Sequence, residues 1–143
     1  MISEDFVGTW KLLSFETRLS SGEIRYPLGP MPIGRIMYDD KGNMAVTVSA
    51  SDRDRMTSPD KIRAPLEEKS AALDSFDAYF GTYSTDEARE IVTHHIEGAL
   101  FPNWTGSTQE RFYSFLEDRL ELSTAPIAYG GDTAIAVLVW QRL

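Results

Sequence analysis

Gly8-Thr9-Trp10 opens the first strand-like run of this 143-residue chain, and Trp140-Gln141-Arg142 closes the last one. Between them lie short segments in which apolar and polar residues alternate, as they do in strands that bury one face. The glycine lets the backbone approach closely. The Trp10 indole can plug the floor of a barrel while a guanidinium stacks across it. The alternating segments suggest a closed β-barrel. Alternation from Trp140 turns Arg142 toward that indole, so we expect Trp10 and Arg142 to be in contact at the closed end of the barrel.

The length and the net charge of the chain argue against several classes of function. A chain of 143 residues is expected to form a single domain, residues 1–143. A net charge of −8 argues against nucleic-acid binding and disfavours an anionic membrane surface. No apolar run approaches the roughly 20 residues that a membrane-spanning helix needs. We therefore expect neither a nucleic-acid nor a membrane partner. The oligomeric state is left open, a homodimer included.

The chain contains no cysteine, which excludes disulfides, Cys-ligated zinc and thiolate catalysis. Residues 1–5 have neither the basic start nor the apolar core of a signal peptide. Together these features predict a cytoplasmic protein.

Eight segments have the pattern of strands, the number found in small ligand-holding barrels. They are residues 7–19, 34–39, 44–50, 82–85, 90–98, 109–116, 119–124 and 134–142. The first is long enough to bend and serve two sides of a barrel, and residues 39–43 form a tight hairpin in which Gly42 supplies positive φ. The fold class predicted is all-β: an antiparallel barrel of about eight strands with one inserted helix near its open end.

That helix is expected to begin at Pro65, because proline suits the first helical position and the acids that follow favour the positive end of the helix dipole. Leu66, Leu73, Phe76 and Phe80 share a stripe at helical spacing, and Gly81 is expected to end the helix. The polar loop 51–64 and this helix should cover or border the open end, since an apolar stripe needs a surface to rest on. Asp52-Arg53-Asp54-Arg55 in the loop could attract an anionic ligand or form a self-neutralising, solvated turn.

A series of short motifs follows in order along nearly the whole chain and resembles the bacterial and fungal lipocalin-like domain family. They are Gly8-Thr9-Trp10, Tyr26-Pro27-Leu28-Gly29, Gly34-Arg35-Ile36-Met37-Tyr38, Asp40-Lys41-Gly42, Phe80-Gly81-Thr82-Tyr83, His94-His95 and Phe101-Pro102-Asn103-Trp104-Thr105-Gly106. The resemblance implies a β-barrel with a pocket for a small molecule. It implies no single reaction, because fold analogy alone does not fix chemistry.

His94 and His95 are the only two histidines, and neighbours on a strand point to opposite faces. They cannot serve one metal, so no metal site is expected. The face that includes Val92, His94 and Ile96 is the more apolar one, which predicts that His94 points inward and His95 outward. An inward His94 could act as a general acid or base. Alternatively, it is a buried neutral histidine bonded to a tyrosine or a backbone carbonyl.

Other candidate ligand-binding residues are Tyr38, Tyr83, Asn103, Trp104 and Arg111. The tyrosines offer hydroxyls on apolar bodies, the usual lining of a selective pocket, although most buried tyrosines only pack. Trp104 could line the mouth of the pocket, and Asn103 could form a hydrogen bond to a ligand carbonyl. Alternatively, their loop only holds the rim of the barrel together. Arg111 shares a face with Tyr113. It is either an interior cation that seeks a carboxylate or part of an exterior ion pair of little energetic value. The resemblance favours the interior placement.

The function expected is a small-molecule-binding barrel for an apolar or aromatic ligand with one or two polar groups, without a cofactor. The alternative is a cofactor-independent cyclase, isomerase or dehydratase that uses the same pocket. His94 would then move the proton, and Tyr38, Tyr83 or Arg111 would stabilise the oxyanion. A haem carrier with His94 as axial ligand is a third hypothesis with less support.

Overall fold

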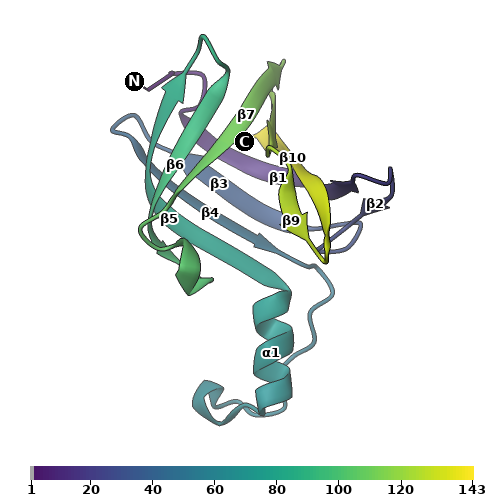
Figure 1. The fold of residues 1–143 in the computed structure, drawn as a ribbon. Helices are drawn as coiled ribbons and strands as arrows, with labels where there is room; N and C mark the ends of the chain where they lie inside the picture. Colours follow the sequence, from purple (N-terminus) through teal and green to yellow (C-terminus); the bar gives the residue numbers. More distant parts are fainter. Residues whose placement is uncertain (1) are drawn as a thin grey trace.

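A computed structural model describes residues 2–143, and its strands close into an antiparallel barrel of eight strands (Figure 1). The barrel strands, in spatial order, are β1 (Gly8–Leu19), β3 (Ile33–Tyr38), β4 (Asn43–Ser49), β5 (Phe76–Asp86), β6 (Ile91–Ala99), β7 (Thr108–Leu116), β8 (Arg119–Ser123) and β10 (Asp132–Arg142). Pairing of β1 with β10 closes the ring. The predicted fold class is confirmed.

The first strand serves two neighbours, as its length suggests. Residues 8–11 of β1 pair with β3, and residues 10–19 pair with β10. A register shift between Leu12 and Ser14 bends the strand, a usual role of a β-bulge. Two short strands escaped the sequence prediction: β2 (Ile24–Arg25) adds to β1, and β9 (Ile127–Tyr129) adds to β10.

The closed end is sealed by aromatic side chains and one cation. The guanidinium carbon of Arg142 lies 4.2 Å from the centroid of the Trp10 ring, which confirms the predicted contact. Phe6, which the sequence analysis overlooked, is fully buried beside Trp10. Its ring lies 4.9 Å from that of Tyr113 and 5.0 Å from that of Phe115. These edge-on ring contacts fill the floor, so empty volume in the barrel lies toward the other end.

The prediction of an apolar helical stripe was wrong. The helix α1 spans only Leu66–Asp74 and buries none of its residues, and Leu66 is 82% exposed. Phe76 and Phe80 belong to β5, where they pair with Ser49 and Ala45 of β4. Hydrogen bonds to the two neighbouring strands stabilise these residues as a strand. A helix over the same residues would have no surface against which to bury its apolar side. Gly81 therefore does not end the helix.

Gly81 instead lies at a register shift between β5 and β6. A Cβ built there would lie 1.9 Å from the carbonyl oxygen of His95, so only glycine lets the two strands come this close.

The segment before β5 borders the open end without covering it. Figure 1 shows α1 extending away from the barrel beside the preceding loop, which contains a short 3-10 helix, η1 (Lys61–Arg63). Only Leu73 and Asp74, in the last turn of α1, line the hollow at the barrel mouth. In residues 2–143 no helix is long and apolar enough to cross a membrane.

Candidate functional site

A cavity of about 190 Å³ lies inside the barrel between the sealed floor and the open end. Most of its wall is apolar and comes from all parts of the barrel, including Phe15, Ile36, Val46, Val48, Leu122, Leu138 and Trp140. The polar side chains in the wall are few: Asp77, Tyr79, His94, Gln109, Arg111 and Thr124. An apolar wall with a few polar groups is typical of a small-molecule site.

His94 lies at the centre of a three-residue hydrogen-bond chain. Its side chain is 1% exposed, whereas His95 faces outward. The Nε2 atom lies 2.7 Å from the Tyr38 hydroxyl, and Nδ1 lies 2.6 Å from the Tyr79 hydroxyl. The expected inward orientation of His94 is confirmed. Its two tyrosine partners match the alternative in which His94 is a buried histidine bonded to tyrosine.

The surroundings keep this histidine neutral. Burial lowers the pKa of His94 from 6.5 to about 3, with smaller contributions from the positive charges of Arg111 and His95. Burial also raises the pKa of Tyr79 to about 12 and that of Tyr38 well above its usual value. All three groups are therefore uncharged at neutral pH.

Arg111 faces the interior. It alternates along β7 with Tyr113 and Phe115, whose rings pack on buried Phe6, and it lines the cavity. Its guanidinium donates to the side-chain oxygen of Gln109 and to the carbonyl of Glu110. No carboxylate within residues 2–143 forms an ion pair with it. The cavity wall thus carries a cation that has no direct carboxylate partner.

Trp104 separates the cavity from the barrel mouth. It belongs to a 3-10 helix, η2 (Pro102–Trp104), between β6 and β7. Its ring centroid lies 6.2 Å from that of Tyr79 and 5.3 Å from that of Phe101, in edge-on contacts. Together with Phe15 and Asp77, Trp104 lines both the cavity and the hollow at the mouth. A ligand that enters from the open end must pass these three side chains.

Three of the predicted site residues do not line the cavity. Tyr38 is buried, and its link to the cavity is the hydrogen bond between its hydroxyl and Nε2 of His94. Tyr83 is also buried, and its hydroxyl donates to the carbonyl of Asp39 in the hairpin. Asn103 is exposed on η2. The geometry gives Tyr83 and Asn103 no contact with the cavity.

The site residues expected from the sequence do not include five wall side chains that carry a polar atom: Asp77, Tyr79, Gln109, Thr124 and Trp140. The signal for two of them was present, since Asp77, Tyr79 and Tyr83 alternate along one strand face. The erroneous extension of the helix hid that pattern. Gln109 likewise alternates with Arg111, and Trp140 with Arg142.

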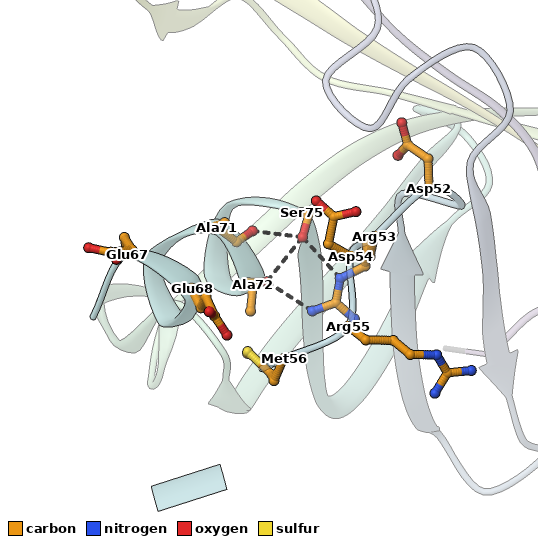
Figure 2. Close-up of a pocket in the computed structure, with 10 residues that line it drawn as sticks. All are labelled: Asp52, Arg53, Asp54, Arg55, Met56, Glu67, Glu68, Ala71, Ala72 and Ser75. Atoms are coloured by element: carbon orange, nitrogen blue, oxygen red, sulfur yellow. Dashed lines mark hydrogen bonds between the residues drawn. The ribbon is translucent and has the colours of Figure 1, made fainter. Parts of the chain in front are cut away.

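A second, open hollow of about 380 Å³ lies outside the barrel, between residues 52–56 and α1 (Figure 2). Arg53 donates to the Ser75 hydroxyl at 2.9 Å and to the Ala72 carbonyl at 3.2 Å. Its guanidinium also lies over the Phe76 ring, 5.2 Å from the centroid. Arg53 therefore ties the loop to the end of α1, whereas Arg55 extends away from the helix. These contacts give Arg53 a structural role and favour the solvated-turn reading over an anion site.

Comparison with known proteins identifies the family. The family model described as a lipocalin-like domain matches residues 7–143. The chain belongs to this family. It is also 36% identical over 84 residues to the 4'-hydroxy-3'-methoxypropiophenone carrier protein ppsC of Aspergillus oryzae, an alignment that covers 54% of this chain and 76% of the relative. No solved structure matches the chain.

The site of this lipocalin-like barrel is poorly suited to acid–base work by His94. Both ring nitrogens already have hydroxyl partners, and a pKa near 3 makes the imidazole a weak base. The same two contacts occupy the atoms that would ligate haem iron. In residues 2–143 no three His, Cys, Asp or Glu side chains are grouped to hold a metal ion.

Proposed function

We propose that this lipocalin-like barrel binds and carries a small aromatic molecule in the cavity between Trp104 and Trp140. The observation that carries the proposal is the cavity itself: an apolar chamber inside the barrel with a few polar groups on its wall. An apolar cavity of about 150 Å³ is large enough for benzene, so about 190 Å³ suits one substituted ring.

The name of the Aspergillus oryzae relative supports an aromatic cargo, since it describes a carrier of a substituted propiophenone. The polar groups of the wall support a ligand with one or two oxygen substituents rather than a pure hydrocarbon. The lowered pKa and filled hydrogen bonds of His94 favour a carrier over a cyclase, isomerase or dehydratase. We further propose that the protein works in the cytoplasm.

Titration with 4'-hydroxy-3'-methoxypropiophenone tests this proposal, with quenching of the intrinsic tryptophan fluorescence as the readout. Trp104→Ala should weaken binding about tenfold, because it removes an aromatic wall of the cavity. Arg111→Met should weaken it as well, and Arg35→Met is the matched control. Arg35 is an exposed arginine on β3 that donates to the neighbouring Gly34 carbonyl.

The proposal predicts saturable binding with one ligand per chain and recovery of the ligand unchanged. Absence of saturable binding to any aromatic probe contradicts the proposal. Recovery of a converted product, lost in His94→Gln, would instead favour the enzyme alternative. Equal effects of Arg111→Met and Arg35→Met would show that the cation of the cavity is not used.

A further inference from the structure

The direction of the hydrogen bonds around His94 follows from burial. The Tyr38 side chain is 2% exposed, and its hydroxyl has His94 Nε2 as its hydrogen-bond partner within the described chain. If Nε2 carried the proton, the Tyr38 hydroxyl would accept it and its own hydrogen would be buried without an acceptor. A buried donor without a partner is costly, so Tyr38 donates to an unprotonated Nε2.

The tautomer of His94 is fixed as a consequence. A neutral imidazole carries one proton, so Nδ1 holds it and donates to the Tyr79 hydroxyl 2.6 Å away. The oxygen of Tyr79 is thus engaged as an acceptor, and its hydrogen is free. Tyr79 is only partly buried and lines the cavity. Its O–H is therefore available to a ligand.

The rest of the cavity wall also offers a donor. The buried indole N–H of Trp140 has no hydrogen-bond partner within residues 2–143, and Trp140 lines the cavity. Two acceptors of the wall are already engaged: Gln109 accepts from Arg111, and Thr124 accepts from the Ala136 N–H. One oxygen of Asp77 accepts from the Ala78 N–H, and its other oxygen remains an acceptor where the cavity meets the hollow at the mouth.

We propose that the cavity selects aromatic ligands that carry a carbonyl oxygen, with the Tyr79 hydroxyl as its hydrogen-bond donor and with Tyr38 and His94 as positioning residues that set the direction of that bond. This inference rests on the proposed carrier function and adds the chemical class of the cargo. It also gives Tyr38, which lies outside the cavity wall, a measurable influence on ligand choice. The unpartnered Trp140 N–H favours the same class, since it too requires an acceptor.

Two probes with the same carbon skeleton test the inference: propiophenone, which has the carbonyl, and n-propylbenzene, which lacks it. The quantity compared is the Kd for n-propylbenzene divided by the Kd for propiophenone, measured for each variant. Tyr79→Phe should lower this ratio about tenfold. Loss of one hydrogen bond in a cavity that holds little water should raise the Kd for propiophenone by that factor. The Kd for n-propylbenzene should stay within about twofold, because the ring is kept.

Tyr38→Phe should lower the ratio as well, by about threefold. Without the Tyr38 hydroxyl, either tautomer of His94 leaves Nε2 without a partner, so the proton is no longer fixed on Nδ1. In the tautomer with the proton on Nε2, Tyr79 donates to Nδ1 instead of to the ligand. Tyr83→Phe is the matched control, because its buried hydroxyl bonds only to the Asp39 carbonyl. Thermal unfolding of each variant shows that it is folded at the assay temperature.

The outcomes separate the inference from the carrier function. If both probes bind but Tyr79→Phe keeps the wild-type ratio, the carbonyl selection is wrong and the carrier function stands. If Tyr38→Phe keeps the wild-type ratio, or Tyr83→Phe lowers it as much, the positioning role of Tyr38 is wrong. If neither probe binds, both proposals fail.

Discussion

Gly8 leaves the space that the guanidinium of Arg142 occupies. A Cβ built on Gly8 would lie 2.9 Å from Nη1 of Arg142, and the residue has a φ of +141°, which side chains rarely tolerate. Nη1 donates to the carbonyl of Val7 at 2.8 Å, and Nη2 donates to that of Asp5 at 2.5 Å. The last strand of the chain thus binds the segment that leads into the first one.

Loss of this arginine should weaken the closed end. We expect Arg142→Ala to lower the free energy of unfolding by about 1–2 kcal/mol, through lost stacking on Trp10 and lost packing of the side-chain stem. Urea denaturation measures the change. Arg119→Ala, at an exposed arginine of β8, should change the free energy by less than about 0.5 kcal/mol. Equal effects at the two positions would contradict the role assigned to Arg142.

Gly8→Ala should destabilise the protein through the same contact. The added methyl group displaces the guanidinium and adopts an unfavourable φ, at a cost of about 1–3 kcal/mol. A double-mutant cycle with Arg142→Ala isolates the steric part, because the clash disappears when the guanidinium is absent. The two destabilisations should then sum to more than that of the double variant. Simple additivity would mean that only the φ of Gly8 matters.

Acid should destabilise the protein through His94. The folded-state pKa near 3 lies below the ordinary value of 6.5, so the unfolded chain binds the extra proton between these values. The free energy of unfolding should therefore fall as the pH drops from about 6.5 to about 3, by up to about 1.4 kcal/mol per pH unit. Asp77, whose pKa burial raises, offsets part of this loss.

The contribution of His94 is measured as the difference in pH dependence between wild type and His94→Gln. Glutamine keeps one donor and one acceptor for the two tyrosines but does not titrate. His95→Gln is the control, since His95 is exposed. A variant at position 94 that retains the wild-type slope below pH 6.5 would show that His94 does not become charged on unfolding.

Backbone amides of residues 51–74 should exchange with solvent faster than those of β6. Loop 51–64 buries only Ala64, and α1 buries no side chain, so little packing holds the segment against local opening. Arg53→Met should accelerate exchange in α1, because Arg53 bonds to Ala72 and Ser75 at its end. Arg55→Met should leave it unchanged. Hydrogen exchange read by mass spectrometry tests both, and protection as strong as in β6 would be the contrary result.

Much of the barrel follows from local pattern. Period-two alternation and turn residues were enough to find the eight barrel strands, although β5 was expected only over residues 82–85. They also gave the hairpin at Gly42, where the Asp39 N–H donates to the Asn43 carbonyl. The same alternation oriented His94 inward and placed Arg142 over Trp10. These inferences held because each depends on which face of a single strand is buried.

The errors concern contacts that no local pattern encodes. The spacing of Leu66, Leu73, Phe76 and Phe80 fits a helix equally well in isolation, and only pairing with β4 made strand residues of the last two. That error hid the strand face of β5 on which Tyr79, the partner of His94 that faces the cavity, alternates with Asp77 and Tyr83. Phe6 lies before the first strand, and its burial depends on the barrel floor that it helps to fill.

The barrel, its closed end and the inward orientation of His94 follow from local sequence, because alternation and turn chemistry act over a few neighbouring residues. The inward placement of Arg111, and the division of inward side chains between the cavity and the floor, depend on the folded barrel. Tyr38, Tyr79 and His94 come from three strands, and their chain of hydrogen bonds exists only once the register of those strands is set. The buried face of a strand depends on interactions between residues close together in the chain, whereas a binding site depends on contacts between residues far apart in it.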